Sequence, residues 1–188
     1  MNVFCIYPEP DTAARHLVDS HVCKMVLESA QMLANCFSLE QLASAECPRT
    51  QKNTVRKYSY VKHPCSIWVR QSRGNMRWLI KHAETMDAER IQRALIKKQY
   101  HIDLEVLGLE FNKLIADSNP VPHFSMGFIT WVHNNIDNSI VPEGELTKFA
   151  QAMPDEFKCE DSIEAYRNFY AKGKSHLHVW TRNKPDWI

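Results

Sequence analysis

Apolar residues recur with the 3.6-residue period of an α-helix along most of the chain. This pattern predicts a long helix from about Asp11, a candidate N-cap, to about Phe37. It predicts a second long helix that opens at His63–Pro64 and runs to about Met86, with proline in the first turn. The segment 38–62 between them is expected to be a loop or short helix followed by a basic connector.

The other segments carry weaker signals. Helical patterns cover 88–100 and 103–116, while 123–142 is ambiguous between helix and extended structure. The sequence Asp161-Ser-Ile-Glu164 resembles a capping box and predicts a short helix through Tyr170. The basic, aromatic tail over 171–188 is expected to pack as irregular coil.

These elements together predict an all-α fold. No repeat, low-complexity stretch or linker divides the chain, so we expect one compact helical domain over residues 1–188. Residues 2–6 should form a short extended segment before the first helix. A chain of 188 residues, 44% of them hydrophobic, buries enough surface to fold without disulfides or a structural metal.

The composition also indicates where in the cell the protein is located. No apolar run approaches the roughly 20 residues that a membrane span needs, and the N-terminus has no basic and apolar signal regions. Six cysteines form no CxxC pair, which favours reduced thiols. We therefore expect a cytoplasmic protein with no membrane association.

The net charge of +1 hides a strong asymmetry. Residues 49–81 hold nine Lys or Arg and no Asp or Glu, so the other 155 residues carry a net charge of −8. A solvated surface is the ordinary interpretation of such a run. Aromatic residues interleave with these cations, which favours binding to a polyanion, and nucleic acid or a nucleotide is the natural partner.

Within this basic segment, Arg70, Arg73, Arg77 and Lys81 follow one another at spacings of 3, 4 and 4. On one helix they would form a cationic ridge along a phosphate backbone. The connector adds Arg56 and Lys57 as further candidate contacts. A solvent-exposed ridge of this kind is expected to contribute little to stability.

The first predicted helix carries a narrow polar stripe. His21, Lys24, Glu28 and Gln31 share one face, and most of the remaining circumference is apolar. Burying such groups is costly unless they pair or line a wet cavity. A structural Lys24–Glu28 pair and a functional cleft both fit, with Glu28 as the acid or base in the second case.

Familiar catalytic signatures are missing from the sequence. It has no P-loop, GxGxxG, HExxH or GxSxG motif and no deaminase-type zinc pattern. His176 and His178 lack a cysteine or carboxylate at ligand spacing. We expect neither a metal nor a cofactor.

The stretch from Ala14 to Glu28 resembles the first helix of the pyrimidine-dimer DNA glycosylases of the T-even phage endonuclease V type. That family places a histidine and a glutamate seven residues apart on this helix, near an N-terminal α-amine, and His21 and Glu28 match the spacing. His63 and a C-terminal aromatic helix that precedes Arg182-Asn-Lys-Pro-Asp-Trp187 are similar too. Blocks such as SHVCKMVLESAQML also resemble phage-encoded proteins without an assigned function.

The resemblance implies a metal-free, all-α fold that grips kinked DNA and flips a nucleotide out of the helix. The N-terminal amine, here on Asn2 or Met1, would attack the sugar C1′, expel the base and form a Schiff base. Glu28 would assist ring opening and strand cleavage, with His21 and Lys24 beside it. His63 and Trp187 would contact DNA. An α-amine titrates near ~7.7–8.0, so a neutral fraction is present at physiological pH.

The leading hypothesis is a DNA glycosylase, with or without AP-lyase activity, that acts on a damaged or modified pyrimidine in duplex DNA. A non-enzymatic nucleic-acid or nucleotide-binding phage protein on the same scaffold is the first alternative, and a nucleotide-processing enzyme is the second. No obligate protein partner is inferred. If the protein is phage-encoded, it would act in the host cell cytoplasm.

Overall fold

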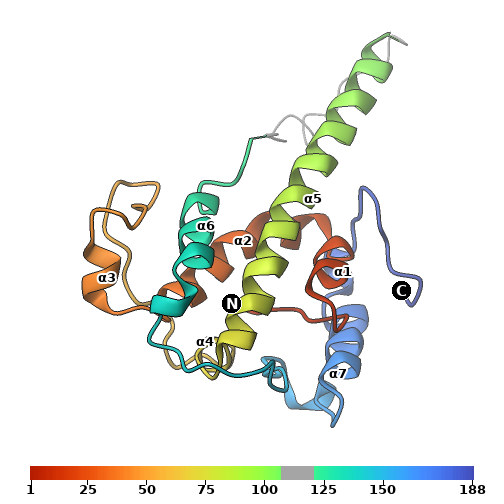
Figure 1. The fold of residues 1–188 in the computed structure, drawn as a ribbon. Helices are drawn as coiled ribbons and strands as arrows, with labels where there is room; N and C mark the ends of the chain where they lie inside the picture. The colour runs from red at the N-terminus through yellow and green to blue at the C-terminus, as the bar shows by residue number, and fades with distance from the viewer. Residues whose placement is uncertain (107–120) are drawn as a thin grey trace.

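The computed structural model describes residues 1–106 and 121–188, which are helical and contain no β-strand (Figure 1). The all-α fold class predicted from the sequence is confirmed. The α-helices are α1 (Pro10–Arg15), α2 (Asp19–Ala34), α3 (Leu39–Ala43), α4 (Pro64–Val69), α5 (Arg73–Val106), α6 (Met126–Asn134) and α7 (Ser162–Asn168). Figure 1 shows α5 as the long central helix, with α1 and α6 on either side of it.

The first predicted helix is two helices in the structure, α1 and α2. Glu9, not Asp11, occupies the N-cap position of α1, and Pro10 opens the helix. Val18 is extended (φ −61°, ψ 155°), which separates the two helices. Long-range contacts hold this break: Tyr170 Oη accepts a hydrogen bond from the Val18 N–H at 2.8 Å, and Arg93 donates to the Leu17 carbonyl at 2.8 Å.

The second predicted helix is also divided, into α4 and α5. Ser72 lies in the break, where its Oγ accepts a hydrogen bond from the Asn75 N–H at 3.1 Å. The Asn75 side chain in turn donates to the Trp68 carbonyl at 2.7 Å and so ties the start of α5 to α4. Beyond Met86, α5 continues without interruption to Val106, through the segment predicted as a separate helix over 88–100.

The remaining elements follow the sequence in part. Within the ambiguous segment 123–142, Met126–Asn134 is helical as α6. Asp161 caps α7 as predicted, because its Oδ1 accepts hydrogen bonds from the N–H groups of Ile163 and Glu164. The tail consists of short turns and coil after a π-helical turn over Phe169–Gly173. The helix predicted over 103–116 lies largely outside the described residues.

The hydrophobic core lies between α2, α5 and the chain's N-terminal segment. Helices α1 and α2 both pack against α5, and α6 packs against both α2 and α5. The N-terminal segment Val3–Ile6 is buried in this core, as are the large side chains of Trp68, Tyr166 and Tyr170. Contrary to the prediction, the segment is not extended throughout, because Phe4 has a positive φ of 43° and its carbonyl accepts the Ile6 N–H at 2.8 Å. As a result the start of the chain lies inside the protein, against α2.

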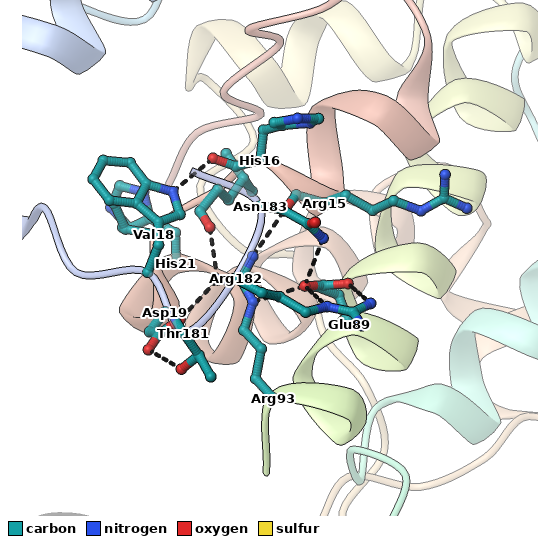
Figure 2. A network of polar contacts seen from close by, with 12 residues as sticks. Arg15, His16, Val18, Asp19, His21, Glu89, Arg93, Thr181, Arg182 and Asn183 are labelled. Atoms are coloured by element: carbon teal, nitrogen blue, oxygen red, sulfur yellow. Dashed lines mark hydrogen bonds and ion pairs between the residues drawn. The ribbon is translucent and has the colours of Figure 1, made fainter. Parts of the chain in front are cut away.

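A polar network fastens the C-terminal tail to the break between α1 and α2 (Figure 2). Glu89 on α5 receives two hydrogen bonds from Arg182, at 2.7 and 2.8 Å, and one from Arg93 at 2.9 Å. Burial alone would raise the pKa of Glu89, but these guanidinium groups outweigh it and lower the pKa. Asp19 similarly binds both Arg93 and Thr181.

Within the described residues no helix is long and apolar enough to cross a membrane. This finding agrees with the absence of a long apolar run in the sequence.

His82 on α5 is a buried histidine that should make stability depend on pH. Burial lowers its pKa to about 3, and neither ring nitrogen has a hydrogen-bond partner among the described residues. In the unfolded chain a histidine titrates near ~6.5. Below that pH the unfolded state therefore binds a proton that the folded state does not, and stability falls as the pH falls toward 3.

We predict that His82→Leu flattens the pH dependence of the free energy of unfolding between pH 6 and 4. The change should approach one proton, or about 1.4 kcal/mol per pH unit. Urea unfolding at several pH values measures it, with the exposed His176 changed to Leu as the matched control. An unchanged slope in His82→Leu would show that His82 is not held neutral in the folded protein.

Candidate functional site

The N-terminus is positioned by Asn2. The Asn2 side chain donates a hydrogen bond to the Ala152 carbonyl at 2.8 Å, and its Oδ1 accepts one from the Val3 N–H at 2.8 Å. Phe4 then adopts a left-handed backbone conformation (φ 43°), which is uncommon for a residue with a large side chain. These constraints direct the chain's first two residues toward α2.

The α-amino group at Met1 lies beside the carboxylate of Glu28. Met1 N is 3.4 Å from Glu28 Oε2, and the Asn2 N–H donates to the same oxygen at 3.2 Å. Lys24 Nζ, one helical turn away, is 3.1 Å from Oε1. Glu28 is only 8% exposed, whereas the Lys24 side chain is 70% exposed. The carboxylate is therefore buried, and two cationic groups are within reach of it.

Met1 itself is packed into the protein. Its side chain is 2% exposed, and the Ser66 hydroxyl on α4 donates a hydrogen bond to the Met1 sulfur at 3.4 Å. Both the Met1 and the Asn2 backbone nitrogens thus lie within 3.4 Å of Glu28. An amine on either residue would meet the same carboxylate.

His21 lies one turn before Lys24 and is neutral. Its ring stacks on Phe4 at a centroid distance of 4.3 Å, and its Nδ1 is 2.9 Å from the Tyr170 hydroxyl oxygen. Because that oxygen already accepts the Val18 N–H, its own proton can go to Nδ1, which leaves the imidazole proton on Nε2. Burial, reinforced by the charges of Lys174 and Lys24, lowers the His21 pKa to about 4.

These groups line a cavity of about 440 Å³. Its walls come from the N-terminal segment, from α2, from residues 152–154 and from the C-terminal part of the chain, which contributes Phe169 and Lys174. The cavity is lined by Lys24, by Lys174 and by Met1, which carries the α-amino group, and by one carboxylate, that of Glu28. A cavity with this balance of charge suits an anionic ligand.

The predicted polar stripe on the first helix is divided between two cavities. His21, Lys24 and Glu28 line the 440 Å³ cavity together with Asn2. Gln31 instead lines a second cavity of about 350 Å³, together with Arg56 and Lys57. The two interpretations of the stripe coexist, because Glu28 both pairs with Lys24 and borders the cavity.

The predicted cationic ridge does not lie on one exposed helix face. Arg70 follows α4, where its guanidinium donates to the carbonyls of Val61 and Ser66. Arg73 donates to the carbonyls of Val141 and Asp137. Arg70 and Arg73 therefore hold backbone segments together, and these contacts predict a contribution to stability that the exposed-ridge expectation did not include.

The other basic candidates differ in their surroundings. Arg77 is exposed but pairs with Glu143, through contacts of 2.8 and 3.2 Å. Arg56 is buried, and its guanidinium lies 4.1 Å from the centre of the Phe128 ring. Lys57 and Lys81 are exposed. Whether any of these residues contacts DNA stays a prediction.

His63 and Trp187, the candidates taken from the family resemblance, both have structural contacts. His63 is the N-cap of α4, and its Nδ1 accepts the Cys65 N–H at 3.2 Å. Burial and the nearby N-terminal charge lower its pKa, against the opposing charge of Glu28, so His63 lies within electrostatic range of the candidate site. The Trp187 indole N–H donates to the Tyr7 hydroxyl at 3.1 Å.

Sequence reasoning did not single out Phe4, Ala152, Tyr170 or Lys174 as parts of this site. Each is brought to α2 from at least 15 residues away along the chain, and Phe4, Ala152 and Lys174 belong to no recognisable motif. The one sequence feature that pointed to any of them was the aromatic pair Phe169–Tyr170, in the C-terminal segment that resembles the family.

The described part of the chain thus contains a helical fold with an amine and a glutamate facing each other in a cationic cavity. The family model for pyrimidine dimer DNA glycosylases matches residues 1–103, which is more than half of the chain and includes Met1, His21, Lys24 and Glu28. The chain belongs to this family. A DNA substrate follows from that membership, because the family acts on DNA. No curated protein and no solved structure matches the chain.

Arg73 and Arg77 allow a matched test of the basic residues. Arg73→Gln should lower the free energy of unfolding by about 1–3 kcal/mol, because it leaves the Val141 and Asp137 carbonyls without their donor. Arg77→Gln removes only an exposed ion pair and should cost less than about 1 kcal/mol. Thermal and urea unfolding distinguish the two, and equal stability of both variants would contradict the assigned contacts of Arg73.

Proposed function

We propose that the protein is a DNA glycosylase with AP-lyase activity that acts on a damaged or modified pyrimidine in duplex DNA. The observation that carries this proposal is the pairing of the α-amino group with buried Glu28 in a cationic cavity, in a chain of this family. A neutral amine is a nucleophile that needs neither a metal nor a cofactor.

In the first step the amine nitrogen attacks C1′ of the target nucleotide. The bond between C1′ and the base breaks, and the base leaves with the electron pair. Glu28 Oε2 is close enough to the amine to accept the proton that the nitrogen loses on bond formation. The product is a sugar joined through C1′ to the protein's own nitrogen.

In the second step the sugar ring opens. A proton returns to the ring oxygen, the bond between C1′ and that oxygen breaks, and a Schiff base forms between C1′ and nitrogen. Loss of a C2′ proton then expels the 3′ phosphate by β-elimination, which cuts the strand. Protonated Glu28 can supply the first proton, and Lys24, 3.1 Å from it, can stabilise the carboxylate that results.

His21 acts in this proposal as a positioning residue. Its ring stacks on Phe4, and Phe4 belongs to the short segment that carries the amine. The hydrogen bond to Tyr170 fixes the orientation of the ring. Because the His21 pKa is lowered to about 4, the imidazole adds no positive charge beside the amine at neutral pH.

The exposed cations supply attraction to the DNA backbone. Lys24 and Lys174 lie at the cavity, and Lys57, Lys62 and Lys81 are exposed within the basic segment 49–81. Arg77 could join them if DNA phosphate displaces Glu143, because both side chains are exposed. Each lysine that contacts phosphate increases affinity and its dependence on salt.

A nucleotide-binding or nucleotide-processing function is the second candidate, since the cavity and its cations could also hold a single phosphate group. The salt dependence of the binding affinity distinguishes these two functions. Contacts to several phosphates of a duplex should make the logarithm of affinity fall steeply with the logarithm of salt concentration, whereas a single bound nucleotide responds weakly. Titrations with an abasic-site duplex and with mononucleotides at 50 to 200 mM salt measure this difference.

The sharpest test of the chemistry is Glu28→Gln. The variant keeps the size of the side chain but cannot transfer the proton, so strand cleavage at an abasic site should fall by ~10²–10⁴-fold. Affinity for the same duplex should change little. Single-turnover cleavage on gels and fluorescence anisotropy give the two quantities.

Glu40→Gln, on the exposed surface of α3, is the matched control for this substitution. A thermal melt of Glu28→Gln is also needed, because removing a buried carboxylate that pairs with cations can destabilise the fold. Cleavage at the parental rate by a folded Glu28→Gln protein would exclude Glu28 as the acid–base group.

A further inference from the structure

Tyr60 is an exposed aromatic residue held in an uncommon backbone conformation. Tyr60 is 69% exposed, more than any other large hydrophobic residue in the described part of the chain. Its φ angle of 49° lies in the left-handed region, which disfavours large side chains. The Tyr60 side chain has no hydrogen bond and no ring contact among the described residues.

The backbone on both sides of Tyr60 is fixed by buried or half-buried side chains. Asn35 on the C-terminal end of α2 donates to the Ser59 carbonyl at 2.8 Å and accepts the Ser59 N–H at 3.1 Å. Arg70 donates to the Val61 carbonyl at 2.6 Å. The loop is therefore pinned at the residues before and after Tyr60, while the ring of Tyr60 projects into solvent.

Tyr58, two residues earlier, differs from Tyr60 because its side chain makes a contact within the protein. Its hydroxyl donates to the Phe37 carbonyl at 2.9 Å, so it has a structural role in holding the loop. Nothing comparable explains Tyr60. An unusual conformation that the surroundings enforce is often part of a functional surface.

The surroundings of Tyr60 are basic. Lys57 and Lys62 are exposed, and neither has an ion-pair partner among the described residues. No acidic residue occurs between Arg49 and Lys81. An exposed ring between unpaired lysines complements a nucleic acid, which offers phosphates to the lysines and a base to the ring.

The loop that carries Tyr60 leads into α4, and α4 contacts the N-terminal residue of the candidate site. The Tyr60 carbonyl accepts the His63 N–H at 2.9 Å, and His63 lies within electrostatic range of the N-terminal amine and Glu28. Ser66, on the helix that His63 caps, contacts Met1. Tyr60 therefore lies in the loop that leads directly into the helix in contact with the N-terminal residue.

We propose that Tyr60 is a DNA wedge: its ring stacks between bases of the duplex beside the nucleotide whose sugar enters the cavity. Extruding a nucleotide costs the stacking energy of its neighbours, and an inserted aromatic side chain compensates part of that loss. The pinned loop presents the ring before DNA binds, so little conformational freedom is lost on binding. This inference rests on the proposed glycosylase function.

Three substitutions of Tyr60 test the wedge. Tyr60→Ala should weaken binding to a duplex that contains a tetrahydrofuran abasic-site analogue by about 5- to 150-fold, the equivalent of one lost base–aromatic stack. Tyr60→Phe should bind like the parent, because stacking does not need the hydroxyl. Tyr60→Gly removes the ring but suits the positive φ, so it should lose affinity without losing thermal stability.

Two controls separate the wedge from a general effect. Cleavage of a single-stranded abasic oligonucleotide needs no extrusion from a duplex, so Tyr60→Ala should leave its rate unchanged. Leu146→Ala removes an exposed apolar side chain outside the basic segment and should leave duplex binding unchanged. Fluorescence anisotropy and single-turnover gels provide both measurements.

Parental affinity of Tyr60→Ala for the abasic duplex would overturn the wedge, and so would an equal loss on single-stranded DNA. A parental protein that binds the abasic duplex but cleaves no abasic DNA would refute the proposed function instead. The Tyr60 variants would still test the wedge through binding in that case.

Discussion

The fold depends on the burial of its own N-terminal segment. Residues Val3–Ile6 lie in the hydrophobic core, where Phe4 packs against His21 of α2 and against Tyr166 and Tyr170 near the C-terminus. This placement carries the α-amino group to the side of α2. An ammonium and a carboxylate would each be costly to bury alone. Their contact makes the burial tolerable, and the cavity beside them leaves the pair open to a ligand.

The break between α1 and α2 serves the same arrangement. Tyr170 binds the Val18 N–H at the break and also orients His21, so one hydroxyl joins the C-terminal part of the chain to both. Arg93 donates to the carbonyls of Arg15 and Leu17, and Glu89 connects Arg93 to Arg182 in the tail (Figure 2). The site is therefore supported by segments from both ends of the chain.

The sequence predicted the features that depend on local pattern. Helical periodicity indicated the all-α fold, Asp161 was identified as a cap, and the spacing of His21, Lys24 and Glu28 placed them on one face. The breaks at Val18 and Ser72 were missed, because Tyr170 and Arg93 stabilise the first from distant parts of the chain, and Ser72 is paired with the distant carbonyl of Glu145. Arg73 looked like a free cation for the same reason, since its acceptors on residues 137 and 141 are not visible in a local pattern.

The central claim is that the N-terminal amine is the nucleophile, and it can be tested by locating the covalent bond. The protein is incubated with an abasic-site duplex and borohydride, which reduces a Schiff base to a stable amine, and the adduct is digested and mapped by mass spectrometry. Intact mass of the untreated protein identifies whether Met1 or Asn2 carries the amine. The account predicts one adduct per chain, on the N-terminal α-nitrogen, with every lysine unmodified. An adduct on Lys24, or none at all, would contradict it.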